Sequence, residues 1–107
     1  DLRTTNLTGA NLTGANLSGA NLTGANLYEA TLSGTDLEDG NLQDANLTRA
    51  NLQEANLTGV DLRNANLKDA DLNKANLTAA NMKNIKNLDS AVKCKTIFSW
   101  GEDSSDC

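Results

Sequence analysis

A leucine recurs at every fifth residue from Leu2 to Leu77, and Met82 continues the series without an insertion. An α-helix turns about 100° per residue, so a spacing of five would spread these leucines around the helix rather than along one stripe. An unbroken strand alternates faces with period two, so an odd spacing would place successive leucines on opposite faces. The period therefore predicts short extended pieces of about three residues, each followed by a corner, in a chain that coils around its own leucines.

The repeating unit reads Ala-Asn-Leu-polar-polar, with a small residue two places before most leucines and, except for Thr31, Asn or Asp directly before each leucine. Alanine leaves room near the axis, because overpacking a filled interior costs about 1–3 kcal/mol. Val60 and Ile85 are the bulkiest departures at this position. The Asn side chains can hydrogen-bond the backbone at the corners, as Asn does in turns generally.

The run Ala-Asn-Leu-Thr-Gly, which recurs from Ala10 to Ala25 and continues with variation to about Ile85, resembles the pentapeptide-repeat family. The resemblance implies an all-β fold, a right-handed quadrilateral β-helix in which four pentapeptides make the four sides of one coil. Leu27 would then stack on Leu7, and the repeats would form about four coils. Its character is closest to the cyanobacterial and thylakoid-lumen members of the family.

The last position of each repeat predicts mixed turn types. Six of these positions hold glycine, which adopts the positive φ of a type II turn without strain. Eight further positions hold residues that favour type I geometry: Glu29, Asp39, Asp44, Arg49, Glu54, Asp69, Lys74 and Ala79.

The pattern stops near Asn87, which predicts a solenoid over residues 1–86 and a C-terminal capping segment over residues 87–107. Residues 87–94 are expected to form a short helix, because Asn87 or Asp89 suits a helix start. A solenoid end needs such a lid over its last leucines and its backbone edge. The alternative is an exposed partner or ligand patch formed by Phe98 and Trp100. The predicted core of the cap is Val92, Ile97, Phe98 and Trp100.

Both cysteines of the chain, Cys94 and Cys107, lie in this segment. An even pair predicts one disulfide that closes a loop of about 14 residues and stabilises it by roughly 3 kcal/mol. Two thiolates without histidine fall short of a zinc site, and a redox switch is the remaining alternative, although the spacing is not Cys-x-x-Cys. A disulfide indicates an oxidising compartment such as the periplasm, the thylakoid lumen or the cell exterior.

Composition argues against several function classes. The 107 residues suit a single domain, and they include no histidine, so the usual general base and the commonest metal ligand are missing. We therefore expect no enzyme, no cofactor and no metal site. No apolar run of about 18 residues predicts a membrane span, and no basic tract indicates nucleic-acid binding. The threonine columns of an ice-binding surface are also interrupted, by Tyr28 and Lys68 among others.

The formal net charge of −5 is concentrated in one coil. This band is either a solvated surface that keeps the protein soluble or a docking patch for a basic partner. Some members of the family resemble duplex DNA in width and charge and inhibit a type II topoisomerase, so an acidic DNA mimic is the alternative function. Interruption of the acids by lysines and arginines argues against it. The band consists of Glu29, Asp36, Glu38, Asp39 and Asp44.

The N-terminal end begins with the repeat already running at Asp1, so an upstream segment is expected to have been processed or trimmed. Leu2, Thr5 and Leu7 would lie at an uncapped end, which predicts end-to-end self-association through the N-terminal coil. The working hypothesis is a rigid, non-enzymatic scaffold whose flat sides or exposed end bind a protein partner. The residues do not identify that partner.

Overall fold

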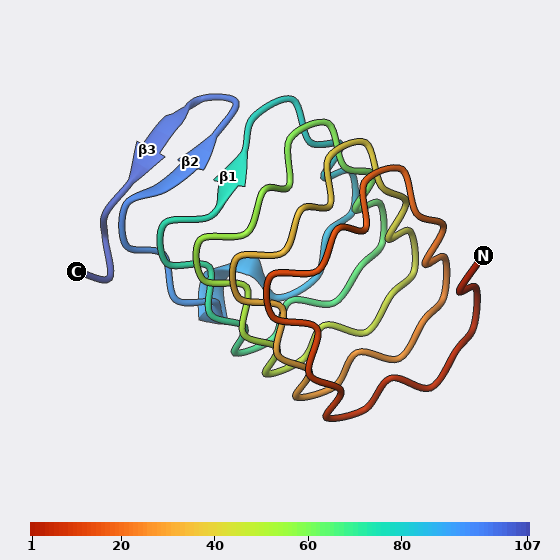
Figure 1. The fold of residues 1–107 in the computed structure, drawn as a ribbon. Helices are drawn as coiled ribbons and strands as arrows, with labels where there is room; N and C mark the ends of the chain where they lie inside the picture. Colours follow the sequence, from red (N-terminus) through yellow and green to blue (C-terminus); the bar gives the residue numbers. More distant parts are fainter.

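The computed structural model describes residues 1–107, and its chain winds into a stack of four-sided coils that measures 33 × 25 × 23 Å along its principal axes. The termini lie at opposite ends of the stack (Figure 1). Residues twenty apart pair as isolated parallel bridges, for example Asn6 with Asn26 and Asn26 with Asn46. The fold is therefore the right-handed quadrilateral β-helix that the resemblance implies.

Each pentapeptide forms one side of a coil. We number the sides 1 to 4 by the columns of residues that point to the axis, each column gaining one member per coil. Side 1 is centred on Leu2, Leu22, Leu42, Leu62 and Met82; side 2 on Leu7, Leu27, Leu47 and Leu67; side 3 on Leu12, Leu32, Leu52 and Leu72; side 4 on Leu17, Leu37, Leu57 and Leu77.

Two local hydrogen bonds shape each corner. The backbone N–H of Thr8 donates to Asn6 Oδ1 at 3.1 Å, and the N–H of Ala10 donates to the carbonyl of Leu7 at 3.0 Å. The first bond is an Asx turn and the second closes a β-turn, so the Asn and the small residue of the repeat both serve the corner. Between coils, the N–H of Leu7 donates to the carbonyl of Asn26 at 2.7 Å.

The prediction of type I turns at the non-glycine corners is wrong. Glu29 and Arg49 have φ values of 56° and 59°, close to the 67° of Gly9, whereas type I turns require negative φ. The ladder explains this agreement, because the N–H of Glu29 donates to the carbonyl of Thr48 in the same way that the N–H of Gly9 donates to that of Tyr28. The stack thus imposes a conformation that costs an L-residue about 1–2 kcal/mol.

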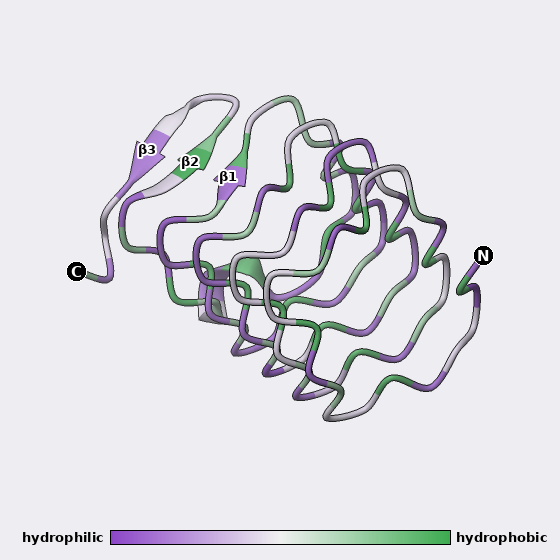
Figure 2. Ribbon diagram, in the orientation of Figure 1, coloured by the Kyte–Doolittle hydropathy of each residue, from purple (hydrophilic) through white to green (hydrophobic).

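The core is a set of leucine columns lined by the small residues. Every leucine of the five-residue series from Leu22 to Leu77 is buried, with a relative exposure of 1% or less. Val60, which replaces the alanine of the repeat, is buried with no exposure. Green hydrophobic segments alternate with purple hydrophilic ones around the coils (Figure 2). At the N-terminal end, Leu2, Leu7, Leu12 and Leu17 are only partly buried.

The tail, residues 87–107, continues the stack with a spacing of 21 instead of 20 residues. Lys86 still pairs with Asn66, but Val92 pairs with Asp71 and Ile97 with Asn76. Asn87 is the extra residue, and it adopts the left-handed conformation with φ 62° and ψ 31°. The boundary predicted after residue 86 therefore coincides with a change of register inside one stack.

The predicted helix over residues 87–94 is wrong in extent, since only the 3₁₀ helix η1 (Leu88–Ser90) forms. Beyond it the backbone is needed for the ladder, because the N–H of Val92 donates to the carbonyl of Ala70 at 2.8 Å. On side 4, β1 (Asn76–Leu77) pairs in parallel with β2 (Thr96–Phe98), and β3 (Gly101–Asp103) pairs antiparallel with β2. This hairpin ends the ladder on that side (Figure 1).

The predicted cap core is also wrong for three of its four residues. Phe98 is buried at 2% exposure, in register above Leu77, but Val92, Ile97 and Trp100 are exposed at 38%, 41% and 68%. Val92 and Ile97 occupy the outward Asn position of the repeat because of the one-residue shift in register. Trp100 stacks on the Phe98 ring with a centroid distance of 4.5 Å and leaves its other surface open.

Candidate interaction surface

The acidic band of the sequence does not form one patch. Its members divide among three sides, because neighbours in the sequence turn a corner every five residues. Glu29 lies on side 2 and Asp44 on side 1. Only Asp36, Glu38 and Asp39 share a side, which is side 4 in the second coil.

The two separated acids lie near arginines of the next coil. Glu29 Oε2 is 3.9 Å from Arg49 Nη2, and the pKa of Arg49 is raised by a hydrogen bond to the Tyr28 hydroxyl and then by the charge of Glu29. Arg63 has its pKa raised first by its hydrogen bond to Asp61, and the charge of Asp44 adds to this effect. These acids are therefore partly neutralised, and the acids of side 4 are the ones that keep an uncompensated charge.

Side 4 is the one side without an outward lysine or arginine. Residues 15–19, 35–39, 55–59, 75–79 and 96–100 contain neither type. Side 1 carries Arg3, Arg63 and Lys83, side 2 carries Arg49, Lys68 and Lys86, and side 3 carries Lys74 and Lys95. The exposed Ile97 belongs to side 4 as well, whereas Trp100 stacks on Phe98, whose side chain points to the axis. Side 4 thus combines acidic and apolar side chains without a cation.

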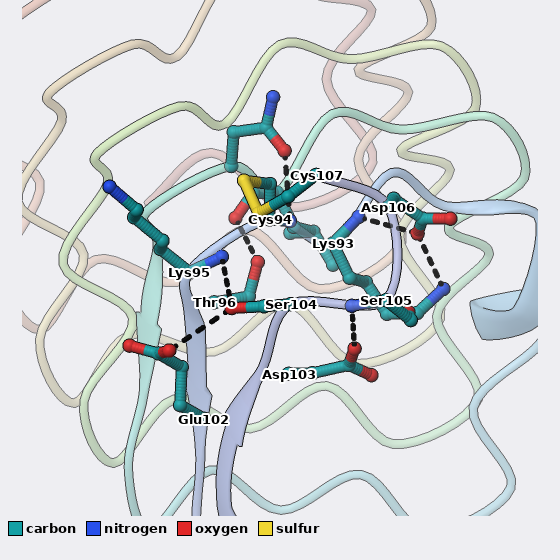
Figure 3. Close-up of a disulfide and its surroundings, with 12 residues drawn as sticks. Lys93, Cys94, Lys95, Thr96, Glu102, Asp103, Ser104, Ser105, Asp106 and Cys107 are labelled. Atoms are coloured by element: carbon teal, nitrogen blue, oxygen red, sulfur yellow. Dashed lines mark hydrogen bonds and ion pairs between the residues drawn. A yellow bond between two sulfur atoms is a disulfide. The ribbon is translucent and has the colours of Figure 1, made fainter.

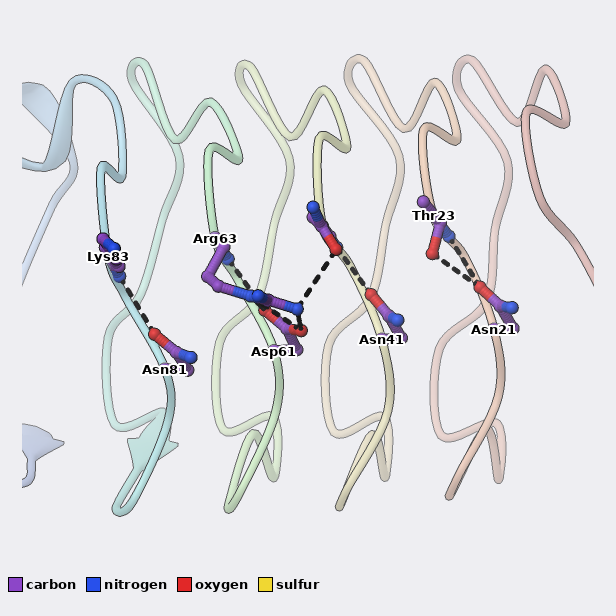
Figure 4. A network of polar contacts seen from close by, with 8 residues as sticks. Asn21, Thr23, Asn41, Asp61, Arg63, Asn81 and Lys83 are labelled. Atoms are coloured by element: carbon purple, nitrogen blue, oxygen red, sulfur yellow. Dashed lines mark hydrogen bonds and ion pairs between the residues drawn. The ribbon is translucent and has the colours of Figure 1, made fainter.

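Side 1 shows how the polar coat is ordered (Figure 4). Asn21, Asn41, Asp61 and Asn81 each accept a bond from the backbone N–H two residues later, at 2.9–3.2 Å. Arg63 also reaches Asp61 through its guanidinium, with Nη2 2.6 Å from Oδ2, and donates to Gln43 Oε1 at 3.2 Å. The outer side chains are therefore held in rows by the repeat itself.

The hydrogen bond from the Arg63 guanidinium lowers the pKa of Asp61 below its usual value, against the opposite effect of partial burial. Because the folded-state pKa is depressed, this interaction stabilises the fold above the unfolded pKa of about 3.9 and is lost as the pH falls through the folded pKa. Replacing Arg63 by glutamine should raise the pKa of Asp61 toward that value in an NMR titration of the carboxyl carbon. An Arg49→Gln variant on side 2 should leave it unchanged, and an unchanged value in Arg63→Gln would contradict the assignment.

Lys93 links the two ends of the tail through its contacts with Asp106. It occupies the column position that leucine holds in the earlier coils of side 3. Its side chain is only 11% exposed, and Nζ donates to the carbonyls of Ala91 at 2.7 Å and Leu88 at 3.1 Å. Asp106 Oδ2 lies 3.5 Å from this ammonium and also accepts the backbone N–H of Lys93 at 2.9 Å. The half-buried charge is therefore satisfied by the last residues of the chain (Figure 3).

As the sequence predicts, Cys94 and Cys107 form a disulfide, with their Cα atoms 4.8 Å apart (Figure 3). The bond keeps Asp106 next to Lys93. The loop inside it is ordered by further bonds: the Ser105 hydroxyl and backbone N–H lower the pKa of Asp103, and that N–H donates to Asp103 Oδ1 at 2.9 Å. A disulfide is compatible with an oxidising compartment.

Other kinds of site find little support. No cluster of three or more His, Cys, Asp or Glu residues could hold a metal ion, and no helix has the length and apolar character to cross a membrane. The one surface depression is lined only by polar residues at the N-terminal end: Asp1, Arg3, Thr4 and Thr23.

The sequence did not reveal that the tail continues the stack as a fifth level. The spacing of five is present there, because Leu88, Lys93 and Phe98 are five apart and Ala91 and Thr96 occupy the small-residue position. A lysine at the central position and one inserted residue obscured this signal. Consequently the outward direction of Ile97 was not predicted.

Comparison with known proteins agrees with this geometry. The family model for pentapeptide repeats (8 copies) matches residues 5–44 and 45–84. The crystal structure of the pentapeptide repeat protein Rfr23 from the cyanobacterium Cyanothece 51142 is similar, with a TM-score of 0.78 and 45% identity over 80% of this chain and 58% of that one. This chain therefore spans less than two thirds of the length of that relative.

A second similar structure is a pentapeptide repeat protein from the Arabidopsis thaliana thylakoid lumen. Its TM-score is 0.52 and its identity 29%, over 79% of this chain and 66% of that one. No curated protein sequence matches this chain.

Proposed function

Because the chain belongs to the pentapeptide repeat family, we propose that it is a non-enzymatic scaffold that binds a partner protein through one of its outer sides. The observation that carries this proposal is the fixed register of the outer side chains. In all, 70 backbone–backbone hydrogen bonds, at the corners and between coils, order the 107 residues, so the outer groups stand at a constant spacing before any partner arrives. A preorganised surface loses little conformational entropy on binding.

Photo-crosslinking from each side tests the scaffold. Gln43, Thr48, Gln53 and Thr58 hold the same repeat position on sides 1 to 4 of the third coil, and all four are partly exposed. We expect that p-benzoylphenylalanine, placed at each position in turn, gives a crosslinked partner from one side and little from the others in an extract of the organism that makes the protein. Crosslinks from no side, or equally from all four, would contradict a scaffold that uses a defined surface.

We propose that the scaffold works in an oxidising compartment, which would be the periplasm, the thylakoid lumen or the cell exterior. The Cys94–Cys107 disulfide supports this, as does the thylakoid lumen origin of one similar protein. The alternative of an acidic DNA mimic gains no support from the charges, because cations interrupt the acids on three of the four sides.

We further propose that the 107-residue chain associates end to end through its N-terminal coil. The backbone N–H groups of Asn6, Asn11 and Asn16 have no acceptor, and Leu2 and Leu7 are partly exposed beside them. The two charged side chains of this coil, Asp1 and Arg3, pair with each other at 2.8 Å. Sedimentation velocity should show dimers at high concentration, and a monomer throughout would contradict the proposal.

A further inference from the structure

Side 4 differs from the other sides in both charge and hydrophobicity. Its second coil exposes Glu38 and Asp39 and partly exposes Asp36, and its fifth level exposes Ile97. Glu102 of β3 stands opposite Ile97 in the hairpin and adds another acid at that end. Exposed apolar groups with a polar surround are typical of protein–protein interfaces.

The geometry of side 4 defines what can bind there. Three strand spacings separate the acidic cluster from Ile97, which is about 14 Å. The outward column between Asp36 and Ile97 holds Asn56 and Asn76, and the neighbouring corner holds Gly59 and Ala79. Asp36 is fixed by the N–H of Glu38 at 3.0 Å and by Asn56 Nδ2 at 3.3 Å. The acidic groups and Ile97 are therefore displayed at a set distance on one side of the stack.

We propose that side 4 binds a basic segment of a partner protein, with lysine or arginine side chains against Asp36, Glu38 and Asp39 and an apolar side chain against Ile97. This inference rests on the proposed scaffold function and assigns its side and the chemistry of its partner. Charge complementarity selects the partner, because a basic segment meets repelling cations on each of the other sides. An extended segment rises about 3.3 Å per residue, so about four residues separate its basic and apolar groups.

Peptide selection tests this inference and needs no purified partner. The probe is the most enriched member of a displayed library of random twelve-residue peptides selected on the oxidised chain. Fluorescence anisotropy of this peptide, labelled at one end, measures its binding to the chain. We expect the selected peptides to combine Lys or Arg with a Leu or Phe and to bind more weakly as salt is raised.

Two variants of side 4 are expected to fold, because each moves the sequence toward its own repeat. Asp36→Asn and Ile97→Asn place asparagine where most repeats have it, and Glu38→Gln and Asp39→Asn change exposed groups only. The triple variant D36N/E38Q/D39N and the single variant I97N should each raise the dissociation constant of the peptide about tenfold. The matched control E54Q/D69N/D89N removes the same charge from sides 2 and 3 and should change it less than twofold.

The outcomes separate this inference from the scaffold proposal. An enrichment of non-basic peptides, no enrichment at all, or an equal loss in the control variant would overturn the assignment of side 4. A partner that crosslinks from Gln43, Thr48 or Gln53 instead of Thr58 would also overturn it while leaving the scaffold function intact.

Discussion

Replacing Leu47 by alanine should lower the free energy of unfolding by about 2–5 kcal/mol, the range measured for buried leucines that leave a cavity. Leu47 is fully buried in the third coil, with leucines of its own column above and below it. The backbone ladder on both sides prevents the coils from closing onto the space, so little of the cavity can be refilled. Chemical denaturation followed by circular dichroism measures the change.

Leu7→Ala is the matched control for this prediction. Leu7 belongs to the same column but lies in the first coil, where it is only partly buried. Its replacement should cost clearly less, since water already reaches the side chain and no enclosed cavity forms. Equal losses in the two variants would mean that the columns do not form a continuous interior.

Removing the disulfide should give the second large effect. Replacing both Cys94 and Cys107 by serine releases a loop of about 14 residues, which the chain-entropy account values at roughly 3 kcal/mol. It also frees Asp106 from Lys93, leaving a half-buried ammonium without its carboxylate. The amide of Lys93, which donates to Asp106, should then exchange its hydrogen at least tenfold faster in NMR measurements.

The neighbouring amide supplies the control within the same molecule. The N–H of residue 94 donates to Asn73 Oδ1 at 3.0 Å, a bond to the previous coil that does not depend on the tail crossing. Its protection should fall much less than that of Lys93. Equal loss at both amides would show that the whole fifth level melts, and unchanged protection at Lys93 would show that the disulfide does not hold Asp106 in place.

The leucine columns could be predicted from the sequence, because few folds other than a four-sided coil can bury a leucine at every fifth residue. The corners could not, since local preference favours negative φ at Glu29 and Arg49 whereas their place in the ladder requires the opposite sign. Tertiary hydrogen bonds decide the conformation at such positions. The prediction for the tail was wrong for a related reason. One extra residue at Asn87 turns Val92 and Ile97 outward, whereas hydrophobicity alone predicts that they are buried.

The acidic band shows a different reason why a surface could not be predicted from the order of residues along the chain. Counting charges along the chain placed Glu29 and Asp44 with the acids of side 4, although a four-sided coil separates them by corners. Counting at a spacing of 20 residues would have paired Glu29 with Arg49 and left Asp36, Glu38 and Asp39 together. The period that defines the fold therefore also defines its surfaces.

The register of the tail is the central claim, because it exposes Ile97 on the same side as Asp36, Glu38 and Asp39. Through-space NMR contacts between backbone protons measure it directly. The structure predicts contacts of Ile97 with Asn76 and of Val92 with Asp71, each 21 residues apart. Contacts of Ile97 with Leu77 and of Val92 with Leu72 as ladder partners, at a spacing of 20, would contradict the structure and the binding surface inferred from it.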